Sequence, residues 1–351
     1  MMALEAMKGD DAMKTTTMSN ANANAAGGAT QRRIELTVGP VLYWWPRETL
    51  LAFYAEVAES AARTVVLGEV VCSRRNEMRL SDWQALARDL ASAGKDVVLA
   101  TQALLASEAE LRTMRHIAEQ DEFAVEAGDA SALRVLAAAA QVRPERRPFV
   151  LGPHINIYNR AALVEHAALG AGTWVAPVEL PLDGVAAANP VSNPVQGPAG
   201  IVQTEVFGFG RLPLAFSARC FTARHHHLPK DNCDFRCRGD ADGLLLATSG
   251  DSQPFLVLNG IQTQSAALHA LLAEAAELRA AGVARVRLSP CANGFAEVLR
   301  WFEAVYNQGA APADAFDALK SIGLPGALVN GYAHRRPGLE ALREPAPAMA
   351  S

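Results

Sequence analysis

The chain has 351 residues, of which 50% are hydrophobic and 20% are charged, and its formal net charge is −5. This balance is typical of a globular protein with an ample core, and it excludes an overall basic field that would recruit nucleic acid. No apolar run reaches the ~18 residues that a membrane-spanning helix needs, and no apolar signal segment follows the N-terminus, so we expect a cytoplasmic protein.

Residues 1–33 are rich in Met, Ala, Asn and Thr and lack apolar periodicity, which predicts a disordered extension. From residue 34 onward, short apolar strands alternate with amphipathic helices. The candidate strands are 36–43, 64–70, 95–101, 123–127, 148–155, 172–178, 201–208 and 283–289, and the candidate helices are 47–62, 81–93, 107–120, 130–141, 159–169, 264–281 and 294–308. Nearly continuous apolar strands are typical of a parallel sheet that is buried on both faces. Eight of them favour a (β/α)8 TIM-barrel-like α/β fold over a doubly wound sheet, and no G-x-G-x-x-G follows the first strand.

The alternation stops after the seventh strand. Residues 209–262 show no long helical pattern, and two apolar runs at 244–247 and 255–258 predict a small hairpin. We therefore expect a single barrel domain over 34–340 that contains a cysteine-bearing insertion at 209–262. Residues 341–351 read as a frayed tail.

Four of the five cysteines have the pattern of a metal-cluster site. Cys220, Cys233 and Cys237 follow the spacing C-x12-C-x3-C in a polar loop, and Cys72 lies far upstream. Cys72 follows the second predicted strand, and the C-terminal ends of barrel strands share one face, so the fold could bring all four together. In a cytosolic protein such cysteines are more often metal-binding or catalytic than disulfide-bonded. Thiolates suit tetrahedral Zn²⁺ or an iron–sulfur cluster, and spacing alone leaves both open.

The neighbours of these cysteines carry weaker signals. Cations in the loop would offset the negative charge of a cluster, although they are equally typical of a solvated loop: Arg219, Arg224, Lys230 and Arg236. Three adjacent histidines, His225, His226 and His227, point in different directions and make a poor ligand set. Cys291 follows the eighth strand, and we expect it to be a spare thiol outside the site.

Polar residues also lie at the ends of several predicted strands, where they would rim a pocket at the barrel mouth: Glu69, Glu126, His154, Asn156, Tyr158, Asn159 and Glu179. Glu205 lies inside the seventh strand, and a carboxylate in a buried apolar strand needs a partner. The sequence has no G-x-S-x-G elbow, H-E-x-x-H or P-loop. A thiol nucleophile at Cys72 or Cys220, with His154 as its base, would leave the other two loop cysteines unexplained. We therefore assign no catalytic residue.

Several segments resemble the collagenase-like peptidase family of barrel proteins, and within it the UbiV-type ubiquinone-biosynthesis proteins. They are GPVLYWWPRETL, LGEVVCSRR, GKDVVLATQAL, FAVEAGD, LPLAFSARCFTARHHHLPKDNC, FLVLNGIQT, VRLSP and NGYAHR, and they span roughly residues 36–335. The N-terminal extension and the triple histidine depart from the family's pattern. The histidines fall between the cysteines and do not alter their correspondence.

The resemblance implies a [4Fe–4S] cluster held by Cys72, Cys220, Cys233 and Cys237. It also implies a heterodimer with a UbiU-type sister protein and an accessory UbiT-type lipid-binding protein. The pair would support oxygen-independent hydroxylation of a polyprenyl aromatic ubiquinone precursor, with prephenate implicated as oxygen donor. The alternative is a zinc- or thiol-dependent peptidase or hydrolase of the wider family.

Overall fold

The computed structural model describes residues 32–342. The expected N-terminal extension and C-terminal tail therefore lie almost entirely outside the described residues. At the start of the described chain, the Arg33 guanidinium lies 2.8 Å from the carboxylate of Glu303.

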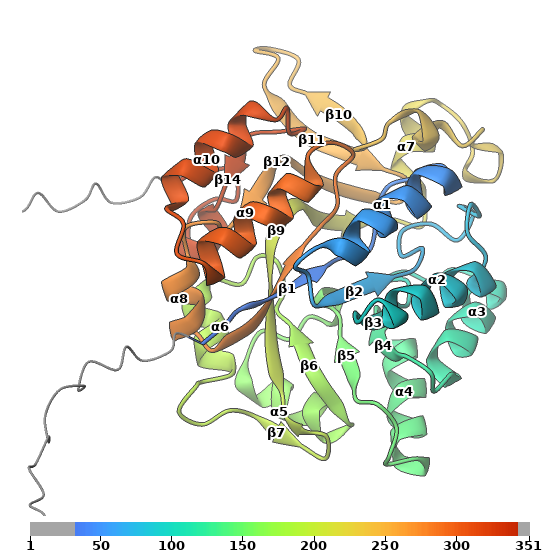
Figure 1. The fold of residues 1–351 in the computed structure, drawn as a ribbon. Coiled ribbons are helices and arrows are strands. Elements are labelled where there is room, and N and C mark those ends of the chain that lie inside the picture. The colour runs from blue at the N-terminus through green and yellow to red at the C-terminus, as the bar shows by residue number, and fades with distance from the viewer. Residues whose placement is uncertain (1–31, 343–351) are drawn as a thin grey trace, which may run out of the picture. The chain divides into compact units, whose positions relative to one another are not determined.

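Eight parallel strands form a closed barrel (Figure 1), which confirms the expected TIM-barrel-like α/β fold. Each strand pairs with the next, β6 pairs with β9, and β13 pairs with both β9 and β1, so the ring closes. The strands are β1 (Glu35–Val38), β2 (Thr64–Leu67), β3 (Asp96–Ala100), β4 (Ala124–Ala127), β5 (Phe149–Leu151), β6 (Ala171–Val175), β9 (Gln203–Phe216) and β13 (Val283–Leu288).

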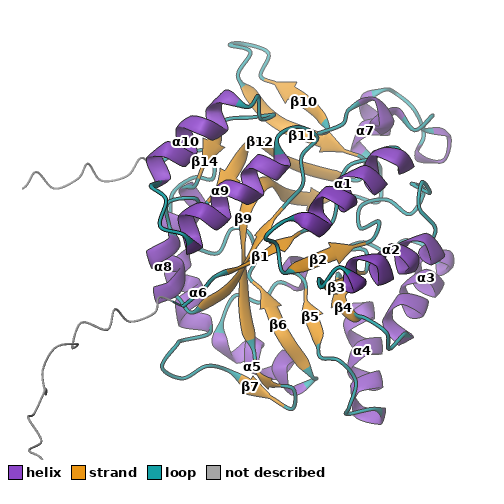
Figure 2. Ribbon diagram, in the orientation of Figure 1, coloured by secondary structure: helices purple, strands orange, loops and turns teal. Residues whose placement is uncertain are grey.

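Helices separate most of these strands and cover the barrel (Figure 2). They are α1 (Arg47–Glu59), α2 (Leu80–Ser92), α3 (Glu108–Glu119), α4 (Ala130–Val142), α5 (Arg160–Ala168), α6 (Leu182–Ala188), α8 (Ala275–Ala280), α9 (Phe295–Asn307) and α10 (Pro312–Ser321). In α1, the buried residues Leu50, Tyr54 and Val57 recur at helical spacing, so one stripe packs on the strands. Among the described helices, none has the length and apolar character needed to cross a membrane.

The insertion begins where β9 continues beyond the barrel. Its first half pairs with β6 and β13, and from Phe209 it pairs antiparallel with β12 (Gln262–Ala270). Strands β11 (Pro254–Asn259) and β10 (Leu244–Ala247) extend this sheet and confirm the expected hairpin. Between β9 and β10 lies the cysteine loop, which contains α7 (Phe221–His225) and short 3-10 turns at Lys230–Asn232 and Arg236–Gly239.

The predicted helix over 264–281 is wrong for its first half. Residues 262–270 form β12, and only Ala275–Ala280 is helical. The Ala- and Leu-rich sequence has helical propensity, but the unpaired edge of the extended β9 offers a ladder of backbone hydrogen bonds, and that tertiary pairing prevails.

Candidate metal-cluster site

Two segments far apart in the sequence carry the four candidate cysteines. Cys72 lies just beyond β2, at the C-terminal end of the barrel, as expected from the sequence. Cys220 precedes α7, Cys233 follows the first 3-10 turn, and Cys237 lies within the second. Cys220 is buried and the other three are half-buried.

The fold brings these four thiols into one neighbourhood. Cys72 interacts electrostatically with Cys237 and Cys220, and Cys233 does so with Cys220 and Cys237. Cys72, Cys220 and Cys233 also pack in one small apolar cluster with Leu42, Val71, Ala223 and Ile261. Within residues 32–342, no group of three or more His, Cys, Asp or Glu side chains is arranged to hold a single metal ion. The thiols are therefore neighbours, without the tight convergence of a one-ion site.

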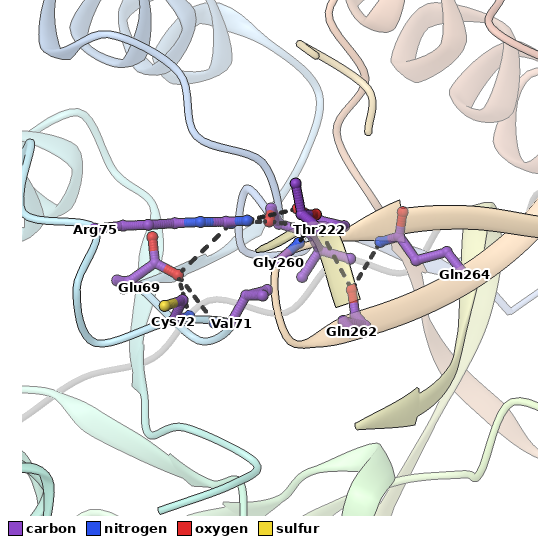
Figure 3. A network of polar contacts seen from close by, with 10 residues as sticks. Glu69, Val71, Cys72, Arg75, Thr222, Gly260, Gln262 and Gln264 are labelled. Atoms are coloured by element: carbon purple, nitrogen blue, oxygen red, sulfur yellow. Dashed lines mark hydrogen bonds and ion pairs between the residues drawn. The ribbon is translucent and has the colours of Figure 1, made fainter. Parts of the chain in front are cut away.

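A buried guanidinium ties the segment that carries Cys72 to the residues after β1 and to the end of β11 (Figure 3). Arg75 donates hydrogen bonds to the Leu42 carbonyl and to Asn259 Oδ1, both at 2.7 Å, and its Nη1 lies 4.0 Å from Glu69. The Glu69 carboxylate in turn accepts hydrogen bonds from the backbone N–H groups of Val71 and Cys72, both at 2.9 Å. This network fixes the backbone that presents Cys72.

The turn between β11 and β12 places the other side of the network. Gly260 has φ +62, a conformation that favours glycine, and a Cβ at this position would lie 2.8 Å from Nη2 of Arg75 and displace the guanidinium. Its N–H donates to Thr222 Oγ1 at 3.0 Å, and its carbonyl accepts from the Phe221 N–H at 2.8 Å. The hairpin turn thereby holds α7, and with it Cys220, against Arg75.

The electrostatics of the site oppose bare thiolates. Burial raises the pKa of Cys72, Cys220 and Cys237, and the neighbouring thiols add to the shift. Burial alone would lower the pKa of Arg75, but Glu69 and the thiols Cys237 and Cys72 outweigh it and raise that pKa. Arg75 Nε is buried and has no hydrogen-bond partner among the described residues. The site thus holds four neighbouring thiols, and beside two of them, Cys72 and Cys237, a cation with a spare donor, which suits an anionic sulfur-rich group.

Most of the cations that the loop sequence offered are exposed and are not buried beside the thiols. Arg219, Arg224 and Arg236 are exposed, as are the three histidines. The loop is instead held by Arg74, which donates to the backbone carbonyls of Lys230 and Asp231 and lies 5.3 Å from the Phe235 ring centroid.

Cys291 lies apart from the other four cysteines. It is buried in the main core, its Sγ is 3.2 Å from the Asn293 carbonyl, and its electrostatic neighbours are Asp242 and Arg211. Burial and then Asp242 raise its pKa to about 12, so this thiol is unreactive at neutral pH.

A second polar group lies inside the barrel and supplies the partner that Glu205 needs. Arg287 on β13 donates to Glu205 Oε1 at 2.5 Å and to both oxygens of Glu126, at 3.1 and 2.6 Å. Thr37 Oγ1 donates to the other oxygen of Glu205 at 3.3 Å. Burial would lower the pKa of Arg287, but Glu126 and then Glu205 outweigh it and raise that pKa. Glu126, Arg287 and His154 line a narrow cavity at the barrel mouth.

The remaining candidate residues lie near the barrel rim or in the segment that joins β5 to α5. Tyr158 donates a short hydrogen bond to Glu179 near the barrel rim. Asn159 caps α5 by accepting a hydrogen bond from the Ala162 N–H at 2.9 Å, which is a structural role. Asn156 has a left-handed backbone conformation after the short turn that follows β5.

Sequence reasoning missed Arg75, Asn259 and Arg287. A cation in a buried strand carries the same signal as Glu205, so Arg287 in VARVRLS was detectable. The dipeptide Asn259-Gly260 is a hairpin-turn signal. Nothing in the sequence indicated that Arg75, rather than the loop cations, would be buried beside the thiols.

The chain also resembles known proteins. It is similar to the solved structure of the U32 peptidase Mk0906, with 12% identity over 78% of this chain and 98% of that chain, and a TM-score of 0.38. It is similar to the spore cortex-lytic enzyme SleL of Bacillus megaterium QM B1551, with 11% identity over 80% of this chain and 75% of that chain, and a TM-score of 0.41. The family model "Peptidase family U32" matches residues 50–307. Because this match covers well over half of its length, the chain belongs to peptidase family U32.

Proposed function

We propose that this chain is an iron–sulfur subunit of an oxygen-independent hydroxylase that acts on the aromatic ring of a ubiquinone precursor. Cys72, Cys220, Cys233 and Cys237 would hold a [4Fe–4S] cluster, and a UbiU-type protein would be its partner. The observation that carries the proposal is the meeting of four thiols from two distant segments beside a buried cation with an unused donor. The ring substrate, prephenate and the UbiT-type accessory protein are supported by the UbiV-like segments over 36–335.

When bound, such a cluster supplies one-electron transfer. The chain's own residues would hold and tune it. Arg75 places positive charge beside the sulfurs, which favours the more negative, reduced state. Glu69 fixes the Cys72 backbone, and Leu42, Val71 and Ile261 keep the cysteines in an apolar setting that limits water.

A thiol-peptidase mechanism receives less support from these residues. Within the described chain, no cysteine is hydrogen-bonded to a histidine, the arrangement that activates a thiol nucleophile. The ring of His154 instead packs edge-on against Phe216, with centroids 4.8 Å apart.

The test is anaerobic co-expression of this chain with its UbiU-type partner, followed by iron analysis and measurement of ubiquinone in cells grown without oxygen. Single Ser substitutions of the four cysteines should each remove the iron and the ubiquinone. Cys291→Ser, the matched control, should retain both. Full iron content in all four variants would refute the ligand assignment, and normal ubiquinone without this chain would refute the pathway assignment.

A further inference from the structure

An apolar cavity lies near Cys72, outside the barrel mouth. It has a volume of about 290 Å³ and is lined by the C-terminal ends of β2 and β3 together with α2 and α3. Its apolar walls include Leu67, Met78, Trp83, Leu99, Met114 and Ile117. Pockets of this size and lining are typical of small apolar ligands.

The cavity is also lined by polar and charged residues: Glu69, Ser73, Arg75, Asn76, Gln102 and Glu110. Arg75 Nη1 lies 4.0 Å from Glu69 and offsets its charge, so the charge of Glu110 is the one that no cation of this lining offsets. Ser73 donates to Glu110 Oε1 at 2.5 Å, and the Ala106 N–H donates to Oε2 at 2.5 Å. Burial would raise the pKa of Glu110, but the hydrogen bond from Ser73 and those from the backbone outweigh it and keep that pKa below its ordinary value. The Glu110 carboxylate repels an anionic ligand, whereas its oxygens keep free lone pairs that accept a hydrogen bond from a hydroxyl group.

The side of the cavity that contains Glu110 is adjacent to the segment that carries Cys72. A smaller cavity shares Ser73, Gln102 and Glu110 with the large one, and it is also lined by Cys72, Lys230 and Ile261. A ligand with its polar end at Glu110 would therefore lie next to the segment that carries Cys72.

We infer that this cavity binds a neutral aromatic molecule with a hydroxyl group and an apolar substituent, with the hydroxyl donating to Glu110 and the apolar part lying against Met78, Trp83 and Met114. The inference rests on the proposed function and deepens it, because it assigns the ring substrate to a site beside the cluster ligands and not to the barrel mouth.

The test is calorimetric titration of the full-length, anaerobically prepared protein with two probes: 4-hexylphenol and 4-hexylbenzoate. The phenol should bind about tenfold more tightly than the benzoate, since the benzoate brings a second negative charge to Glu110. Glu110→Gln should weaken the phenol several-fold and bring the two Kd values within roughly threefold. Equal binding of phenol and benzoate to the unmodified protein would overturn the inference.

Bulky substitutions at the rim of the cavity test whether the ligand binds there. Thr113 and Ala109 are exposed residues of α3 that line the cavity, so Thr113→Trp or Ala109→Trp should weaken 4-hexylphenol at least about tenfold without disturbing the core. Arg112→Trp, on the same helix but outside the lining, is the control and should leave the Kd unchanged. Unchanged Kd values in both blocking variants would refute the site. If the unmodified protein binds 4-hexylphenol but contains no iron, the proposed function alone is refuted. If it contains iron but does not bind 4-hexylphenol, this inference alone is refuted.

Discussion

Removal of Arg287 should be among the most destabilising single substitutions in the barrel. The Arg287 side chain is 4% exposed, and its partners Glu126 and Glu205 are 7% and 2% exposed. Arg287→Met removes three hydrogen bonds and leaves two carboxylates buried without a counter-charge. Breaking one buried pair costs about 3–5 kcal/mol, and since two carboxylates are left here we expect a loss of about 5 kcal/mol in the free energy of unfolding.

The assay is urea unfolding followed by circular dichroism, at about pH 8 and again at about pH 5. Because protonation neutralises an unpaired buried carboxylate, the deficit of Arg287→Met relative to the parent should be smaller at the lower pH. The triple variant Arg287→Met/Glu126→Gln/Glu205→Gln, which leaves no charge in this buried group, should recover to within about 2 kcal/mol of the parent. A loss below about 1 kcal/mol in the single variant, or a deficit that does not depend on pH, would refute the reasoning.

Three single substitutions test other parts of the structure. Burial lowers the pKa of His269 from 6.5 to about 4, so the unfolded chain takes up the proton first, and the free energy of unfolding falls as the pH drops from 6.5 to about 4. His269→Leu should remove about 3 kcal/mol of that acid sensitivity in unfolding titrations, and an unchanged pH profile would contradict the shift assigned to His269. Asn159→Ala should cost about 1 kcal/mol through loss of the α5 cap and leave iron content unchanged, so a loss of iron would show that Asn159 has a role beyond capping. Arg75→Gln should shift the reduction potential of a bound cluster to lower values, because a cation beside the sulfurs is lost. A reduction potential equal to that of the parent in a redox titration would contradict the role given to Arg75.

The barrel could be predicted because its signal is local. Each strand is a short apolar run, and the predicted hairpin runs 244–247 and 255–258 correspond to β10 and β11. The failure over 264–281 has a largely non-local cause, since β12 pairs with the part of β9 that continues past the barrel, as well as with β11 and with Leu328–Val329. No pattern within residues 262–270 reports that distant edge.

The four cysteines of the candidate site could be predicted from the sequence, but the residues that surround them could not. Cysteine is rare in this chain, so the spacing of Cys220, Cys233 and Cys237 stood out, and the position of Cys72 after a strand indicated the shared face. Arg75 could not be distinguished from Arg74 in the same segment, although one is buried beside the thiols and the other holds the loop backbone. Such a choice depends on packing between segments distant in the sequence.

The cluster assignment is tested by the iron and acid-labile sulfide content of the anaerobically purified protein, measured together with its absorbance spectrum. We expect a brown protein with broad absorbance and about four iron and four sulfide per chain. A colourless protein that holds one zinc, or neither iron nor sulfide, would contradict it.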